Sequence, residues 1–328
     1  MCYELAKNNK TDIIMKRIIT IMALALFATS ALCAQTTKNN SNNLALAVLI
    51  DDSGEDFPSV AKQQIENRLF RLLTQNGVAT TDYFSQFFIT VKATPLTKDV
   101  VAGPPMKLVE TIEMDFYIAD YYNQLIYSTT SVTCKAVGNS DAKCYLDGLR
   151  TIDLTSPEMQ KFVTDGKSKI IEYYNTQADK MMEKAVYLAS QKKYDEALWI
   201  ISTIPAECDK SEQALRLGTE IFQQYTDYQC QVNLAKAKAE WASQQNADGA
   251  FLAGEYLSNI YPDAACYGAA EKLYAEIKGK VLDDWKFEMK KWQDGVDVES
   301  QRINAWREVG VAYGRGQQPS TTNITWLR

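Results

Sequence analysis

The stretch ASQKKYDEALWIISTIPAEC (residues 189–208) decides the fold, because it recurs in longer form as ASQQNADGAFLAGEYLSNIYPDAAC (residues 242–266). The two copies start 53 residues apart, and a weaker third copy, KKWQDGVDV, begins at Lys290. Each unit has the pattern of a long helix, a tight turn and a shorter helix that ends near a proline. Helix pairs at a regular spacing are typical of an α-solenoid. We therefore expect an all-α helical-repeat domain over residues 166–313, with breaks at residues 191–193, Pro205, Asn246, Pro262 and residues 294–295.

The segment EKAVYLASQKKYDEALWIISTIP (residues 183–205) resembles a tetratricopeptide repeat. Ala185, Ala189, the YDEAL stretch that begins at Tyr194, and Pro205 stand where that family places its small, aromatic and proline residues. The spacing exceeds the family's period of about 34 residues, so we expect extended long helices. The resemblance implies protein–protein scaffolding, with another envelope protein or a peptide held on the concave face, and makes Tyr194 a partner-binding candidate.

Residues 44–160 have a different pattern, which predicts an α+β domain. The apolar run LALAVLI (residues 44–50) is consistent with a buried central strand, and Pro58 opens a helix that closes at Asn76-Gly77. The order β-α-β-β-β-β describes a mostly antiparallel sheet with a helix on one face. This topology is similar to that of small envelope domains of the curli-secretion-channel and penicillin-binding-protein-activator type. The later strands are expected at residues 88–93, 107–120, 124–137 and 142–153.

The cysteines after residue 34 predict two disulfides. Cys134 and Cys144 lie five residues on either side of Asn139, so a symmetric hairpin would place them opposite each other and allow a cross-strand bridge. Cys208 and Cys230 bracket one long helix and lie about 33 Å apart at 1.5 Å per residue, which is too far to pair. The returning helix brings Cys266 back to the level of Cys230. We therefore expect a Cys230–Cys266 bridge and an unpaired Cys208.

The N-terminal segment carries the parts of a secretory signal. Lys16-Arg17 precedes the apolar run IITIMALALFATSALC (residues 18–33), which ends in small residues suited to cleavage. With Met15 as the start, we expect removal of residues 1–34 and a polar tether at residues 35–43. Export would place the protein in the periplasm or at the surface of a Gram-negative cell, with outer-membrane association left open.

Two alternatives to cleavage remain open. In one, residues 1–33 are retained as an anchor. In the other, Cys33 is lipidated, although Ser30 and Leu32 stand in the reverse of the order that a lipoprotein site requires. After Gln35 no run is apolar for long enough to cross a membrane, so we expect no transmembrane segment in the mature chain.

The chain of 328 residues is acidic and contains no histidine. Lys and Arg number 35 against 41 Asp and Glu, for a net charge of −6 and without a basic stripe. Nucleic acid and anionic lipid are therefore disfavoured as partners. The absence of histidine removes Ser-His-Asp and Cys-His catalysis and the usual His-bearing metal sites. We expect no cofactor, and a protein that is not an enzyme.

An acidic cluster follows the first expected strand. Asp51, Asp52, Ser53 and Glu55 stand where α/β folds place ligands, which makes them weak candidates for a divalent-cation site. Asp51-x-Ser53 resembles the metal-ion-dependent adhesion motif of von Willebrand type A domains, although Glu55 replaces that motif's second serine. The alternative is a solvated loop whose carboxylates favour the positive end of the helix opened by Pro58.

Aromatic residues supply further partner-binding candidates. Trp285, Met289 and Trp292 follow i, i+4, i+7 spacing on an expected helix, where such a stripe forms either the core or a partner groove. Trp326 lies in the aperiodic tail of residues 314–328, which either docks, binds another protein or frays. The tyrosines around the sheet indicate either ordinary packing or an aromatic platform for glycan or peptide: Tyr117, Tyr121, Tyr122, Tyr127, Tyr173 and Tyr174.

Three hypotheses about function follow. The favoured one is a non-catalytic exported envelope protein that scaffolds a partner through the tetratricopeptide-like solenoid. The alternative is a module that binds a divalent cation, glycan or peptide, centred on the acidic loop at residues 51–56. A carboxylate-based hydrolase is the third, although no pair of acids can be identified without three-dimensional distances.

Overall fold

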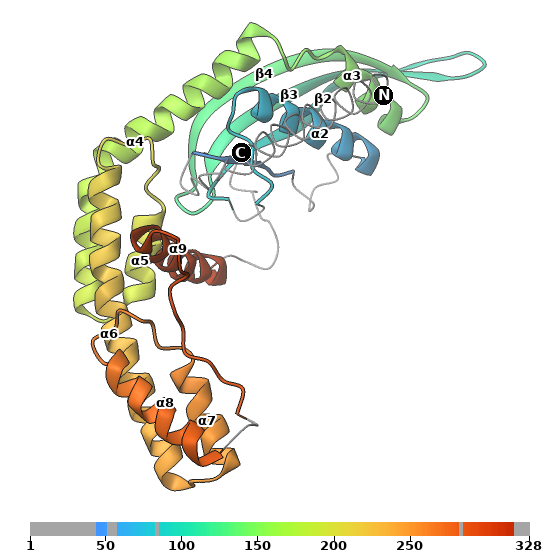
Figure 1. Ribbon diagram of the computed structural model, residues 1–328. Helices are drawn as coiled ribbons and strands as arrows, with labels where there is room; N and C mark the ends of the chain where they lie inside the picture. Colours follow the sequence, from blue (N-terminus) through green and yellow to red (C-terminus); the bar gives the residue numbers. More distant parts are fainter. Residues whose placement is uncertain (1–43, 51–57, 83–84, 282–284, 318–328) are drawn as a thin grey trace, which may run out of the picture. The chain divides into compact units, whose positions relative to one another are not determined.

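The computed structural model describes residues 44–50, 58–82, 85–281 and 285–317 (Figure 1). The predicted signal segment, the tether, the acidic loop and Trp326 lie outside these residues. The α+β fold class is confirmed, because a four-stranded mixed sheet is followed by a helical region. The elements are β1 (Leu46–Val48), α2 (Ser59–Gln75), β2 (Phe87–Val101), β3 (Lys107–Asp120), β4 (Leu125–Gly138), α3 (Asp141–Thr151), α4 (Pro157–Ser190), α5 (Tyr194–Ser202), α6 (Ser211–Ser243), α7 (Ala247–Leu257), α8 (Tyr267–Val281) and α9 (Val298–Gln317).

The sheet has the strand order β1-β2-β3-β4, with β1 parallel to β2 and the other pairs antiparallel. Alternate β3 residues point to one face, so that Ile112, Met114, Phe116 and Ile118 are fully buried. The apolar face of α2 covers this side of the sheet and contributes to the same core. Pro58 caps α2 and Asn76 ends it, as the sequence predicts.

The expected fifth strand is wrong, because residues 141–151 form helix α3. Ser140 caps this helix by accepting a hydrogen bond from the backbone N–H of Lys143. The predicted Cys134–Cys144 disulfide is wrong for the same reason, because the two cysteines do not lie on paired strands. Both are buried free thiols, and the Cys144 Sγ instead donates to the backbone carbonyl of Leu108.

Helices α4 to α7 form two successive helical hairpins, and the predicted breaks between them are confirmed. Residues 191–193 separate α4 from α5, and Pro205 lies between α5 and α6. Asn246 caps α7, because its side-chain oxygen accepts from the backbone N–H groups of Asp248 and Gly249. The long helices α4 and α6 contain 34 and 33 residues, so the expected extension of the long helices is also confirmed.

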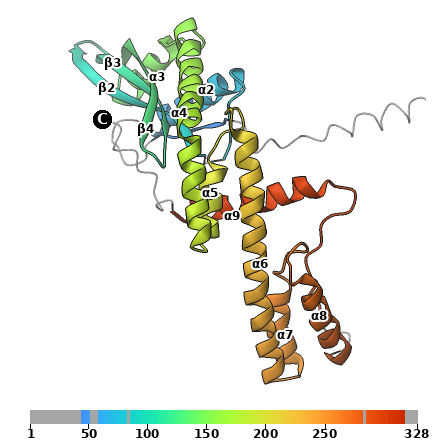
Figure 2. The same cartoon turned by 90° about the vertical axis from the view of Figure 1, so that its left-hand side faces the viewer.

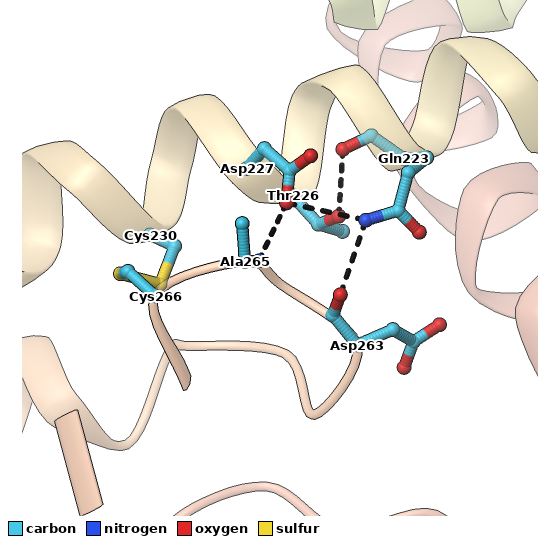
Figure 3. The surroundings of a disulfide bond; sticks show 7 residues. All are labelled: Gln223, Thr226, Asp227, Cys230, Asp263, Ala265 and Cys266. Atoms are coloured by element: carbon cyan, nitrogen blue, oxygen red, sulfur yellow. Dashed lines mark hydrogen bonds between the residues drawn. A yellow bond between two sulfur atoms is a disulfide. The ribbon is translucent and has the colours of Figure 1, made fainter. Parts of the chain in front are cut away.

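The Cys230–Cys266 disulfide is confirmed, with 6.0 Å between the two Cα atoms, and Cys208 is a buried free thiol. Figure 3 shows how the α7–α8 loop is also hydrogen-bonded to α6. The Asp227 carboxylate accepts from the backbone N–H of Ala265 at 2.7 Å, and the Gln223 side chain donates to the carbonyl of Asp263 at 3.1 Å. One covalent link and two hydrogen bonds therefore tie this loop to the long helix.

The third helical hairpin is absent, because residues 285–297 are not helical. Trp285, Met289 and Trp292 consequently share no helix face, contrary to the prediction. This segment is held by α8, whose Tyr274 and Tyr267 hydroxyls donate to the carbonyls of residues 287 and 290. These side-chain hydrogen bonds satisfy backbone carbonyls that, in a helix, would accept from backbone N–H groups of the same helix.

Helix α9 returns to pack against α5 and α6, as both views show (Figures 1 and 2). Its Trp306 is fully buried against Gly218 of α6, and the backbone of Gly310 lies directly against Leu198 of α5. One hydrophobic core includes buried residues from β1 through α6 and Trp306 of α9. A second core is built from α6, α7, α8 and Trp285.

Candidate functional site

A pocket of about 350 Å³ lies where the end of the sheet meets α4, α5 and α9. We call it the junction pocket. Its lining combines aromatic rings, side-chain amides, two aliphatic side chains and two opposite charges. The lining residues are Gln86, Tyr122, Asn123, Tyr173, Gln177, Met181, Lys184, Glu196, Trp199, Ile200, Thr203, Tyr313 and Gln317.

The sheet end of the junction pocket is fixed by Asp120, the fully buried last residue of β3. Its Oδ1 accepts from the backbone N–H groups of Tyr122 and Asn123, each at 2.9 Å. Its Oδ2 accepts from the side chains of Gln86 at 2.8 Å, Asn123 at 2.9 Å and Tyr174 at 3.0 Å. A buried carboxylate requires such partners, and these five donors hold the β3–β4 turn in one geometry.

Two tyrosine hydroxyls near Asp120 stay protonated over a wide pH range. Burial, followed by the charge of Asp120, raises the pKa of the Tyr174 hydroxyl. The same two causes, in the same order, raise the pKa of Tyr173, whose ring contacts that of Tyr174 at 5.2 Å between centroids. Tyr173, which lines the junction pocket, therefore keeps a neutral hydroxyl that is able to donate a hydrogen bond.

The aromatic wall of the pocket depends on two glycines of α9. A Cβ on Gly314 would lie 2.5 Å from the ring of Trp199, and a Cβ on Gly310 would lie 2.8 Å from the backbone of Leu198. Their absence lets α9 approach α5 closely and brings Tyr313 to the pocket. The Trp199 ring also meets Tyr122 edge-on, with 4.7 Å between centroids. The rings are therefore held in place, yet they are only half-buried.

The charged groups of the junction pocket are Lys184 of α4 and Glu196 of α5. Neither makes an ion pair with any residue that the structure describes. Burial, followed by the charges of Glu196 and Asp195, raises the pKa of the Tyr313 hydroxyl. The pocket thus offers flat rings for stacking, amides for paired hydrogen bonds and one charge of each sign.

The tyrosines named from the sequence separate into three groups. Tyr122 and Tyr173 line the junction pocket, whereas Tyr127 and Tyr174 are buried behind it. Tyr117 and Tyr121 instead pack near a small apolar cluster that contains Phe88, Ala47, Leu49 and Ala119. A single platform of all six tyrosines does not exist, but two of them belong to a pocket.

Three of the partner-binding candidates lie within packed structure. Trp285 is buried and donates its indole N–H to the Ala250 carbonyl at 2.9 Å, while Trp292 donates to the Asp263 carboxylate. Tyr194 is buried beside Tyr225 and Tyr228. Of the two interpretations of the tryptophan stripe, core packing fits the structure. Trp326, together with Asp51, Asp52, Ser53 and Glu55, lies outside the described residues.

No group of three or more His, Cys, Asp or Glu side chains among the described residues is arranged to hold a metal ion. Among the helices that the structure describes, none combines the length and apolar character needed to cross a membrane.

Comparison with known proteins gives no family for this chain. No family model and no curated protein matches it. A minor lipoprotein of Acinetobacter baumannii is similar over 38% of this chain and 84% of its own, with 15% identity and a TM-score of 0.21. A protein of Caulobacter crescentus CB15 described as a putative lipoprotein is similar over 40% of this chain and 88% of its own, with 8% identity and a TM-score of 0.21. Similarity at this level carries no argument about the function of this chain.

Proposed function

We propose that this protein is an exported, non-catalytic binding protein of the cell envelope, and that the junction pocket holds an extended peptide segment of a partner protein. The observation that carries the proposal is the lining of the pocket. Half-buried rings, side-chain amides and two aliphatic side chains converge there from the sheet end and three helices. Pockets that combine apolar walls with a few fixed polar groups are the usual form of ligand sites.

The composition of the lining fits a peptide. Amide side chains such as Gln177 and Gln317 can pair with both the N–H and the C=O of an extended backbone. Met181 and Ile200 provide aliphatic contacts for apolar side chains, and Lys184 and Glu196 can each meet an opposite charge on the partner. A sugar ring could contact the aromatic faces and the amides, but it would bury less apolar surface against the aliphatic side chains than a peptide would.

The segment that resembles a tetratricopeptide repeat contributes to the same pocket. Lys184, Glu196, Trp199, Ile200 and Thr203 all lie within residues 183–205 and all line the junction pocket. That resemblance implies binding of peptides or other subunits. Export is supported by the signal-like N-terminal sequence and by the Cys230–Cys266 bridge, since disulfides persist in oxidising compartments.

The proposal can be tested by site-specific photo-crosslinking in native envelopes. A photoreactive residue at position 177, inside the pocket, should capture a partner that the same residue at position 180 does not. Lys180 is on the same helix and exposed, but it does not line the pocket. Equal capture at both positions would count against the proposal.

A binding measurement with the captured peptide should follow. We expect Lys184→Ala and Gln177→Ala to weaken its binding by about tenfold each, because each removes a hydrogen bond or charge contact of about 1 to 2 kcal/mol. Lys180→Ala should leave the affinity unchanged. If a glycan competes for the pocket and no peptide is captured, the ligand class proposed here is wrong.

A further inference from the structure

The β2–β3 hairpin ends in an exposed apolar tip. The uncharged run VVAGPPM occupies residues 100–106, and every residue from 94 to 107 is exposed. The exposed fractions are 59% for Val100, 51% for Val101 and 56% for Met106. An apolar surface that no described part of the chain covers is a common mark of an interaction site.

The hairpin register shows why the tip is uncovered. Val101 pairs with Lys107, and the next β3 residue, Leu108, pairs with Gly138, the last residue of β4. Past the end of β4 the hairpin therefore continues only through the Val101–Lys107 pair and the turn between these residues, and Figure 1 shows this hairpin extending past β4. The same register places the end of β4 and the start of α3 immediately beside the base of the tip.

Three unpaired cations surround that base. A cavity of about 430 Å³ is lined by Pro105 of the tip and by Lys107, Lys143 and Arg150, among others. All three cations are exposed, and none makes an ion pair with a described residue. The carboxylate in this lining, Asp147, accepts from the backbone N–H of Val137 at 2.9 Å.

Four further charged groups lie near the tip, one cation and three carboxylates. Lys98 pairs with Asp141 at 2.6 Å and with Glu110 at 3.6 Å. Asp99 is an exposed carboxylate on the hairpin itself. The cavity wall itself holds three cations against one carboxylate, a local excess of positive charge in a chain whose net charge is −6. Composition alone disfavours anionic lipid as a partner, and this local excess is visible only after folding.

We propose that the hairpin tip docks on an anionic phospholipid surface. Val100, Val101 and Met106 enter the boundary between headgroups and acyl chains, while Lys107, Lys143 and Arg150 contact headgroup phosphates. An apolar element flanked by cations is the arrangement that binds anionic bilayers at their surface. A run of seven residues is far too short to span a bilayer, so the contact is interfacial.

The test is flotation of the purified chain with vesicles. Vesicles of phosphatidylglycerol and phosphatidylcholine in equal parts should carry the protein upward at low salt, whereas vesicles of phosphatidylcholine alone should do so far less. The triple variant Val100→Ser, Val101→Ser, Met106→Ser should lose most of this binding. The matched control is Val296→Ser with Val298→Ser, because these valines are also exposed, at 43% and 40%, but lie far from the tip in sequence.

A second variant tests the cations. Lys143→Gln with Arg150→Gln should weaken vesicle binding by about fivefold for each charge removed. These side chains are exposed, so circular dichroism should show the fold unchanged. The proposal is overturned if both vesicle types bind equally, if neither binds, or if the tip variant floats like the native chain. It is likewise overturned if the tip instead joins two copies of the chain, which sedimentation would detect.

Discussion

Removing the Cys230–Cys266 disulfide should destabilise the part of the chain around α7 and α8. The bridge joins residues 36 positions apart, and closing a loop of that length in the unfolded chain corresponds to about 4 kcal/mol. The Asp227 and Gln223 hydrogen bonds remain after the sulfurs are removed, so the loop should keep its folded arrangement on α6. We therefore expect Cys230→Ala with Cys266→Ala to cost about 2 to 4 kcal/mol.

The loss should be local. Cys230 belongs to the second core, built from α6, α7, α8 and Trp285, whereas the sheet and α4 belong to the other core. Hydrogen exchange monitored by mass spectrometry resolves such regions separately. Amides of α7 and α8 should exchange roughly 30- to 1,000-fold faster in the variant, since each 1.36 kcal/mol is a factor of ten. Amides of β3 should keep their protection.

The matched control is Cys208→Ala. It also removes a buried sulfur, but from a free thiol in the other core, so it should leave α7 and α8 unchanged. Unaltered exchange in α7 and α8 of the double variant would refute the reasoning. So would an equal increase in β3, because it would mean that the two cores unfold as one unit.

Three further outcomes are expected. Gly310→Ala should lower the free energy of unfolding by about 1 to 3 kcal/mol in urea denaturation, because its Cβ would overlap the α5 backbone. The control Gly316→Ala should leave the free energy of unfolding unchanged, because its Cβ would meet open space. Asp120→Ala should cost about 3 kcal/mol in thermal unfolding by leaving its buried donors unpaired, whereas exposed Asp179→Ala should cost under 1 kcal/mol. Burial, and then the neighbouring carboxylates, raises the pKa of Cys208 to about 11. The Cys208 thiol therefore stays protonated to a higher pH in the folded chain than in the unfolded chain. The free energy of unfolding should fall by roughly 3 kcal/mol as the pH rises from about 8.5 to 11. In denaturation measured at several pH values, Cys208→Ala should abolish this loss.

The features of the fold that could be predicted from the sequence depended mostly on helix lengths and helix caps. Asn246 and the proline-terminated units fixed the hairpin breaks, and counting residues along α6 placed Cys230 opposite Cys266. Helix α3 was missed because residues 142–153 include strand-forming types. The cap at Ser140 and the helical spacing of buried Cys144, Tyr145, Gly148 and Leu149 prevail there over residue preference.

The irregular segment at residues 285–297 was missed for a different reason. Trp285, Met289 and Trp292 have helical spacing, yet their surroundings are set by residues far away in sequence. The indole of Trp285 donates to Ala250, and Tyr274 and Tyr267 hold the backbone of the segment. Local periodicity contains no information about such tertiary hydrogen bonds, so it could not exclude a helix.

The junction pocket could be predicted only in part. Tyr122 and Tyr173 were candidates because of their residue type. Gln86 and Tyr313 lie more than two hundred residues apart in the sequence, so no local pattern could place them in one pocket. One signal was present in the sequence: Gly310 and Gly314 are four residues apart on α9 and face Trp199 and its neighbour Leu198. Such a pair indicates close helix packing, although it does not identify the partner helix.

The return of α9 links stability to the proposed function. Trp306 is fully buried against Gly218 of α6, where a Cβ would lie 2.8 Å from the indole ring. Once Trp306 is docked, Gly310 and Gly314 bring the helix onto α5, and Tyr313 then completes the junction pocket. The pocket therefore exists in full only while α9 is docked. A ligand that binds there must stabilise the docked helix by mass action, so substitutions at Gly218, which does not line the pocket, should weaken binding as well as folding.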